Sequence, residues 1–103
     1  FKERRNFVVK ALNKIDGINC LNPDGAFYVF PSCKELLGKK DERGNKLKTD
    51  TDFVRSLLEN SGVAVVQGSA FGLEGFFRIS YATSMENLKK ALEKISTFCK
   101  SLI

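Results

Sequence analysis

The sequence predicts an α+β fold, a two-layer sandwich in which a small, mainly antiparallel sheet carries helices on one face. Segments with a helical apolar spacing alternate with short β-rich segments, in the order α-β-loop-α-β-β-α. The chain has 103 residues, of which 43% are hydrophobic and 28% are charged. This length and composition fit a single globular domain that spans residues 1–103.

The first predicted element is a helix over residues 1–15. Its apolar side chains recur at the spacing of one helix face, at Val8, Ala11, Leu12 and Ile15. Gly17 suits the left-handed position that often follows a helix. The turn sequence NPDG at 22–25 then leads into AFYVF at 26–30, which is rich in β-formers and predicts a strand.

A long charged segment, residues 34–50, is interpreted as a solvated surface loop with one helical turn near Lys34. A second helix is predicted to follow it. Thr49 suits the N-cap of this helix, and Asp52 stands at the reciprocal position of a capping box. The helix ends at NSG, residues 60–62. Its apolar face is formed by Phe53, Val54, Leu57 and Leu58.

The last third of the chain is predicted to contain two strands and a helix. VAVV at 63–66 is interpreted as a short buried strand, and the glycine-rich loop QGSAFGLEG at 67–75 leads into a second strand at 76–82. Thr83 can cap the final helix, with Glu86 at the capping-box position. The apolar face of that helix is formed by Leu88, Leu92, Ile95, Cys99 and Leu102.

The composition excludes several kinds of chemistry. The chain has no histidine, which removes Ser-His and Cys-His catalysis and histidine metal sites. Its three cysteines, Cys20, Cys33 and Cys99, are widely spaced, so we expect reduced thiols of a cytoplasmic protein, with no metal site and no disulfide. No signal peptide or membrane span is recognised. The net charge of +5 is most typical of a moderately basic solvated surface.

Arg78 is the main candidate for a functional residue. In GFFRISY, residues 75–81, strand alternation places Phe77 and Ile79 on one face and Arg78 and Ser80 on the other. If the helices cover the first face, Arg78 points away from the core. Two interpretations stay open from the pattern: an exposed arginine whose stem covers the sheet, or a two-pronged donor for a carboxylate or phosphate.

Two other features suggest ligand binding less strongly. The glycine-rich loop matches neither common phosphate-binding motif, and it precedes a strand rather than a helix. The aromatic strand matches the RNA-recognition motif only in part, and the order of elements differs. The basic stretch at 39–48 contains no aromatic residue. A free-standing α+β module that binds an anion or RNA therefore remains the alternative hypothesis.

Three blocks of sequence resemble a known family. They are DGAFYVFP at 24–31, GVAVVQGSAFG at 62–72 and FRISYATSMENLKKALEKI at 77–95. Together they are similar to the carboxy-terminal small domain of class I aminotransferases, the fold-type I enzymes that use pyridoxal phosphate. The resemblance covers essentially the whole chain, and within the class it is strongest to bacterial aspartate aminotransferases of the aspartate/prephenate subgroup.

The resemblance implies roles for a few residues. Arg78 matches the arginine that holds the α-carboxylate of the substrate. Phe27 matches, more weakly, an aromatic residue near the substrate entrance. Gly68, Phe71 and Gly72 would shape a loop that moves with domain closure. We expect no catalytic, cofactor-binding or metal-binding residue within these 103 residues.

The resemblance also implies a larger parent enzyme. The lysine that holds pyridoxal phosphate and the other cofactor ligands would lie in a large domain upstream of residue 1. The parent is expected to be a cytoplasmic homodimer that transfers an amino group between aspartate, or a related amino acid, and 2-oxoglutarate. The isolated chain is expected to be inactive, to bind no cofactor and to have no nucleic-acid or membrane partner; it need not be dimeric.

Overall fold

The computed structural model describes residues 2–20 and 27–103. The predicted turn at 22–25 lies outside the described residues. Along the chain the elements are α1 (Lys2–Asn13), β1 (Tyr28–Val29), the 3-10 helix η1 (Lys34–Leu36), α2 (Asp50–Ser61), β2 (Val66–Gln67), the 3-10 helix η2 (Gly68–Phe71), β3 (Phe77–Ser80) and α3 (Met85–Ser101).

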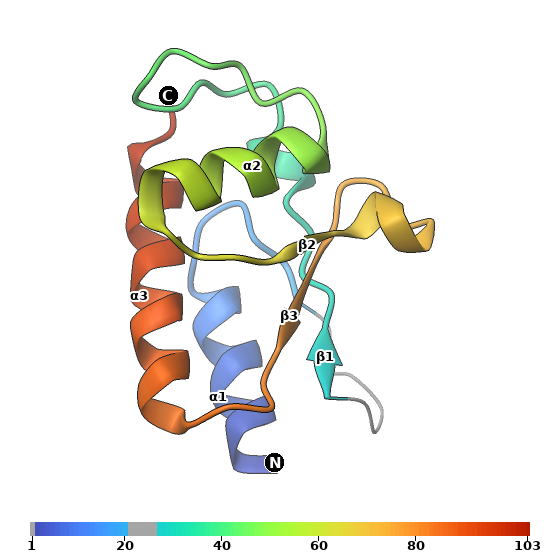
Figure 1. Ribbon diagram of the computed structural model, residues 1–103, viewed down its shortest axis with the longest axis vertical. Coiled ribbons are helices and arrows are strands. Elements are labelled where there is room, and N and C mark those ends of the chain that lie inside the picture. Colours follow the sequence, from blue (N-terminus) through green and yellow to red (C-terminus); the bar gives the residue numbers. More distant parts are fainter. Residues whose placement is uncertain (1, 21–26) are drawn as a thin grey trace.

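The sheet has three strands in the order β1-β3-β2, and both pairings are antiparallel. In Figure 1, α1 and α3 run alongside each other to one side of the strands, and α2 lies across their upper end. Helix α3 packs against both α1 and α2. The predicted α+β fold with a small antiparallel sheet is therefore confirmed.

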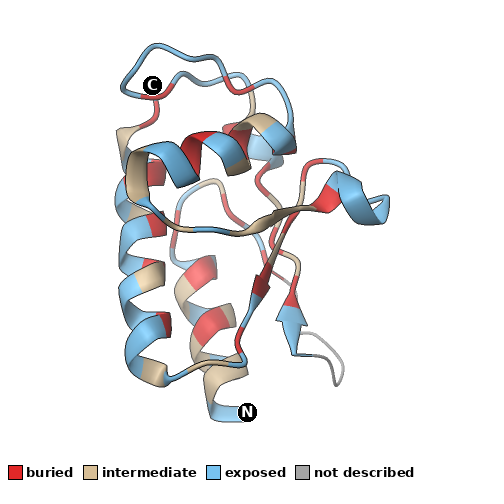
Figure 2. Cartoon of the chain, viewed as in Figure 1, coloured by how far each residue is buried: buried red, intermediate tan, exposed pale blue. Residues whose placement is uncertain are grey.

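The core joins the helices to the central strand. The ring of Phe53 in α2 lies 5.1 Å from that of Phe77 in β3 and 5.6 Å from that of Phe98 in α3, measured between centroids. The apolar face predicted for α3 is buried throughout, as Figure 2 shows for the inner side of that helix. In α2, Leu58 departs from the prediction because it is 50% exposed.

Helix α2 begins and ends where the sequence predicts. The Thr49 hydroxyl accepts a hydrogen bond from the Asp52 N–H at 3.2 Å, and the Asp52 carboxylate accepts one in return from the Thr49 N–H. This reciprocal pair satisfies two of the N–H groups that a helix start leaves without partners. Gly62 follows the helix with a φ of 71°, in the left-handed region that favours glycine.

The strand predicted at 63–66 is wrong in its extent and burial. Only Val66 and Gln67 pair with β3, because the ladder starts opposite Arg78. Val63 and Val65 are half-buried and Ala64 is exposed. An apolar run in the sequence indicates a buried segment, but it does not predict how many of its residues form hydrogen bonds with a neighbouring strand, because that depends on the path of that strand.

The cap predicted for the last helix is also displaced by one residue. Ser84 is the N-cap of α3, and its hydroxyl accepts the Asn87 N–H at 3.2 Å. The Thr83 hydroxyl accepts instead from the side-chain amide of Asn87. Two neighbouring hydroxyl residues are both good caps, so the local sequence could not separate them.

Candidate functional site

Arg78 lies in the central strand and points away from the core. Its neighbours Phe77 and Ile79 are buried, whereas Arg78 is half-buried, so the predicted alternation of faces is confirmed. Opposite Arg78 stands Val66 of β2. Because strands flank β3 on both sides, the backbone that carries the guanidinium is held by two ladders.

Two aromatic rings contact the guanidinium. Its central carbon lies 4.2 Å from the ring centroid of Tyr28 and 4.6 Å from that of Phe71. Tyr28 is paired with Ser80, so it is a diagonal cross-strand neighbour of Arg78 on the same face. Phe71 comes from η2 and meets Phe30 edge-on at 5.8 Å. Cation–π contacts of this kind hold a planar guanidinium by its faces.

No carboxylate among the described residues forms an ion pair with Arg78. Aromatic faces contact the flat side of a guanidinium, whereas its N–H donors point outward in the guanidinium plane. An arginine with this environment presents a cationic pair of parallel donors. Its geometry matches the two oxygens of a carboxylate.

The second residue predicted at the site, Phe27, is 51% exposed at the start of β1. Its carbonyl oxygen accepts the Tyr81 N–H at 3.0 Å, which extends the pairing between β1 and β3. The next residue, Tyr28, is the one that contacts Arg78. Sequence reasoning missed Tyr28, although its strand alternation with Val29 signals a side chain on the outer face.

Several backbone N–H groups of the glycine-rich loop already have acceptors within the protein. The Gly68 N–H donates to the Phe76 carbonyl, the Leu73 N–H donates to the Gly68 carbonyl, and the Ser69 N–H donates to the Asp50 carboxylate. A Cβ on Gly68 would overlap the Leu73 carbonyl oxygen. The loop is thus a tightly folded turn that presents Phe71, and these donors are not free to bind a phosphate.

The aromatic residues of the RNA-like pattern are divided between the two faces of the strand. Tyr81 is buried in the core together with its neighbours Phe77 and Ile79. Phe76 is half-buried on the face of Arg78, and the Lys34 ammonium lies 4.9 Å from the centroid of its ring. Base stacking requires aromatic rings that are displayed on the open face of a sheet. On its outer face this strand displays one half-buried ring, Phe76, where the RNA-recognition motif needs a second aromatic residue and this chain has Arg78, which weakens the RNA-binding alternative.

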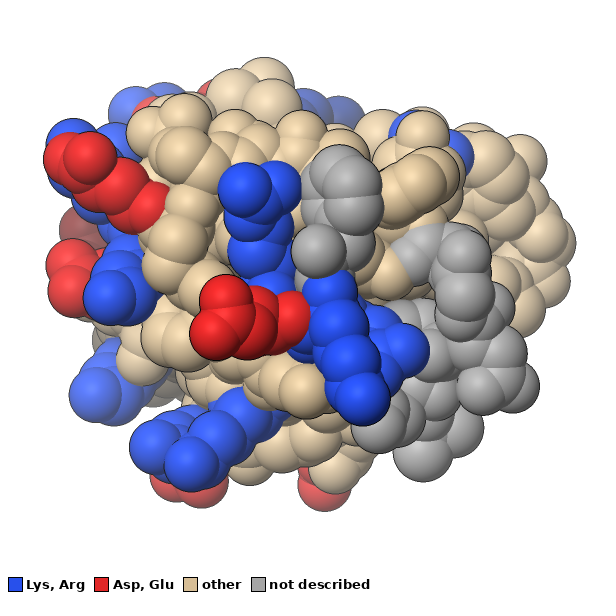
Figure 3. Space-filling view, turned by 90° about the horizontal axis from the view of Figure 1, so that it is seen from below, with Lys and Arg blue, Asp and Glu red and all other residues tan. Residues whose placement is uncertain are grey.

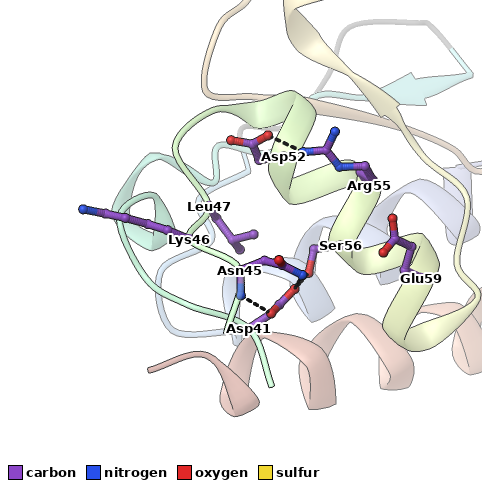
Figure 4. A pocket seen from close by; sticks show the side chains of 8 residues that line it. All are labelled: Asp41, Asn45, Lys46, Leu47, Asp52, Arg55, Ser56 and Glu59. Atoms are coloured by element: carbon purple, nitrogen blue, oxygen red, sulfur yellow. Dashed lines mark hydrogen bonds and ion pairs between the residues drawn. The ribbon is translucent and has the colours of Figure 1, made fainter. Parts of the chain in front are cut away.

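A buried carboxylate in the charged segment 34–50 is a feature that sequence reasoning missed. Asp41 is 3% exposed. Figure 4 shows Asp41 close to Asn45, in the same loop, and to Ser56 of α2. Its carboxylate accepts hydrogen bonds from the Ser56 hydroxyl and the Asn45 N–H. The hydrogen bond from Ser56 above all, helped by N–H groups of Asn45 and Arg43 and only partly opposed by burial, lowers the pKa of Asp41 to about 2.

The three cysteines are buried and none of them forms a disulfide. Burial raises the pKa of Cys20 to about 11 and the pKa values of Cys33 and Cys99 to about 12. Since the thiolate is the reactive form, these cysteines are poor nucleophiles. Within the described ranges, no three Cys, Asp or Glu side chains are gathered as metal ligands.

The surface gives two further findings. In Figure 3 the basic side chains on that face are scattered, with acidic side chains among them, and form no continuous basic groove. Searched over its described part, the chain has no helix that is both long and apolar enough to cross a membrane.

The family model for aminotransferase class I and II matches residues 1–95. The chain belongs to the class I and II aminotransferase family. Among curated members, an aspartate aminotransferase of Rhizobium meliloti (strain 1021) is 57% identical over 102 residues, which are 99% of this chain and 25% of that protein. A probable aspartate/prephenate aminotransferase of Rhizobium leguminosarum bv. phaseoli is 58% identical over 99 residues, or 96% of this chain and 25% of its own length.

A solved aminotransferase structure agrees in three dimensions. The crystal structure of an aspartate aminotransferase from Rhizobium meliloti matches with a TM-score of 0.97 at 56% identity, over 99% of this chain and 26% of that one. The chain thus spans about a quarter of the length of the aminotransferases it matches.

Class I aminotransferases depend on pyridoxal phosphate, but the residues described here do not fit that cofactor. A lysine that holds it covalently needs a desolvated pocket, whereas every lysine of this chain is exposed. The N–H groups of Gly68, Ser69 and Leu73, which could otherwise bind a phosphate, already have acceptors within the protein, as described above. The site in this chain is suited to a carboxylate.

Proposed function

We propose that this chain is the carboxy-terminal small domain of a pyridoxal-phosphate-dependent aspartate-type aminotransferase, and that Arg78 binds the α-carboxylate of its substrates. One observation carries the proposal: a half-buried guanidinium contacts two aromatic rings and has no ion-pair partner among the described residues. The names and high identity of the aminotransferase relatives support the same activity for the whole protein.

Arg78 contributes orientation. Two parallel N–H···O bonds fix both the position and the rotation of a carboxylate, which a single-point contact does not. The α-carbon is attached to that carboxylate, so the direction of its C–H bond is restricted as well. Such positioning lowers the entropic part of a reaction barrier. When bound, the cofactor supplies the electron sink, and residues outside this chain would hold it.

The proposed substrates are aspartate, or a related amino acid, and 2-oxoglutarate. Both the amino donor and the oxo-acid acceptor carry a carboxylate next to the reacting carbon, so one arginine can serve both halves of the reaction. The second carboxylate of these substrates would be bound by residues outside the chain. We further propose that the parent enzyme is a homodimer of the cytoplasm.

Replacing Arg78 tests the proposal. In the full-length enzyme, Arg78→Lys keeps the positive charge but loses the two-pronged geometry. We expect kcat/KM for the amino donor to fall roughly 30- to 1,000-fold, which corresponds to a loss of about 2 to 4 kcal/mol of transition-state stabilisation. Steady-state kinetics with aspartate and 2-oxoglutarate measure this.

Arg55→Lys is the matched control. Arg55 is an arginine of α2 whose side chain is 63% exposed and pairs with Asp52. Because surface ion pairs contribute little, this variant should retain the kinetics of the parent enzyme. Arg78→Lys with kinetics equal to those of Arg55→Lys would rule out the carboxylate role.

A further inference from the structure

Asp50, the first residue of α2, is a buried carboxylate that the helix does not need for its own cap. It is 3% exposed. The capping box of α2 is formed by Thr49 and Asp52, so the carboxylate of Asp50 is left to make other contacts. Its place in the first turn of a helix favours the negative charge.

The carboxylate of Asp50 binds the glycine-rich loop at both ends. One oxygen accepts the Ser69 N–H at 2.8 Å, and the Thr51 and Ser69 hydroxyls lie 3.4 Å apart beside it. Burial alone would raise the pKa of Asp50, but hydrogen bonds from Ser69 and from the Gly75 N–H outweigh it and lower that pKa. Ser69 lies within η2, and Gly75 lies two residues before β3.

The loop held in this way carries Phe71. This side chain is 47% exposed, so core packing alone does not fix it. Its ring meets Phe30 on one edge and the guanidinium of Arg78 at 4.6 Å. The direction in which Phe71 points is therefore set by the backbone of η2, which Asp50 anchors.

We propose that Asp50 is a positioning residue for substrate binding: by anchoring η2 to the start of α2, it holds Phe71 against Arg78 and so orients the guanidinium. This inference rests on the proposed role of Arg78 in binding the substrate carboxylate. The path runs from the Asp50 carboxylate through the Ser69 N–H and η2 to the Phe71 ring, and each step is a contact of the structure.

The chemistry of the path suggests two variants. Asp50→Asn keeps the side-chain volume but replaces one acceptor oxygen with an N–H₂ group, which cannot accept from the loop. Phe71→Leu keeps an apolar side chain but removes the aromatic face against Arg78. In the full-length enzyme we expect each to raise KM for aspartate about tenfold while kcat stays within about twofold, because binding is lost in ground state and transition state alike.

Asp52→Asn is the matched control. Asp52 occupies the same first turn of α2 and accepts backbone hydrogen bonds, but it binds the N–H groups of Lys48 and Thr49 rather than the glycine-rich loop. Losing this cap should lower the melting temperature and leave KM for aspartate unchanged. If Asp50→Asn likewise lowers the melting temperature and leaves KM for aspartate unchanged, its role is merely structural and the inference is overturned.

A double-mutant cycle with Arg78→Lys separates this inference from the proposed function. If Asp50 acts through Arg78, Asp50→Asn should change KM by less than about twofold in the Arg78→Lys background. An unchanged tenfold effect there would overturn the inference while leaving the role of Arg78 intact. If Arg78→Lys alone leaves kcat/KM unchanged, the proposed function fails instead.

Two further measurements keep the test decisive. The dissociation constant of succinate, an unreactive dicarboxylate, reports binding without chemistry and should rise in parallel with KM. Should Asp50→Asn not fold, Phe71→Leu tests the same path, because a half-exposed side chain can be replaced without collapse of the core. Phe71→Leu with the KM of the parent enzyme would overturn the inference.

Discussion

At the scale of single residues, two arginines of this chain show how environment decides function. Arg55 pairs with a carboxylate one helical turn away and lies mostly in solvent. Arg78 has aromatic rings as its neighbours and no carboxylate within ion-pair distance among the described residues. The same side chain is therefore paired with a carboxylate in one place and stacked against aromatic rings in the other, where we propose that it binds the substrate carboxylate.

Asp41 gives a prediction at this scale. Asp41→Asn should destabilise the folded chain by about 1 to 3 kcal/mol at neutral pH, because a buried hydroxyl and two backbone N–H groups lose a charged acceptor. Urea denaturation measures the free energy of unfolding. Glu42→Gln, at an exposed neighbour, is the control and should change it by less than about 0.5 kcal/mol.

The effect of Asp41→Asn should depend on pH. The pKa of Asp41 is lowered from 3.8 to about 2 in the folded state. The stabilising contribution of a carboxylate with a lowered pKa is complete above its unfolded pKa and is lost as the pH falls toward the folded value. The difference between parent and variant should therefore shrink between about pH 4 and pH 2. A difference that stays constant over this range would contradict the assignment.

At the scale of elements, the starts of α2 and α3 are set by side-chain caps. Helix α2 has a complete capping box, and α3 has a single serine cap. Both caps are formed within a few residues of sequence, so the cap of α2 could be predicted from the sequence and that of α3 was placed to within one residue. The remaining ambiguity at α3 came from two adjacent hydroxyl residues, Thr83 and Ser84.

Alanine substitution should distinguish the two hydroxyls. Ser84→Ala removes the acceptor of the Asn87 N–H and should cost about 1 kcal/mol of unfolding free energy. Thr83→Ala removes only an exposed side-chain contact and should cost less than about 0.5 kcal/mol. Thermal or chemical denaturation of both variants makes the comparison. If Thr83→Ala loses more unfolding free energy than Ser84→Ala, then Thr83 is the residue that caps α3.

At the scale of the whole molecule, one core supports a site at its surface. The Cα radius of gyration is 12.6 Å, close to the ~13 Å typical of a compact domain of this length. Buried phenylalanines of α2, β3 and α3 pack together behind the strand that carries Arg78. The chain thus provides a packed support for the substrate contact that we propose at Arg78, while its lysines all lie in solvent.

The isolated chain should therefore have no cofactor chemistry. On titration with pyridoxal phosphate at micromolar concentration, we expect no saturable absorbance band, because every lysine of this chain is exposed and none lies in the desolvated pocket that activates an amine. Coupled assays should detect no transamination. A saturable band would show that a lysine of this chain holds the cofactor, contrary to the proposed division of the site.

Much of the fold could be predicted because the signals are local. Caps, glycine terminators and apolar spacing act over a few residues, and they placed α2 correctly from Thr49 to Gly62. Alternation along β3 likewise predicted that Arg78 points away from Phe77 and Ile79. The length of β2 was overestimated, because pairing depends on the path of another strand.

By itself, the sequence determined the class of fold, the bounds of α2 and the face on which Arg78 lies, since these follow from a local capping box and from repeats of 3.6 or 2 residues. The tertiary structure alone decided what surrounds Arg78. Tyr28 of β1 and Phe71 of η2 contact its guanidinium. Asp50 of α2 binds the loop that carries Phe71. No local sequence pattern predicts these contacts, because they depend on strand register and helix packing between residues far apart in the chain.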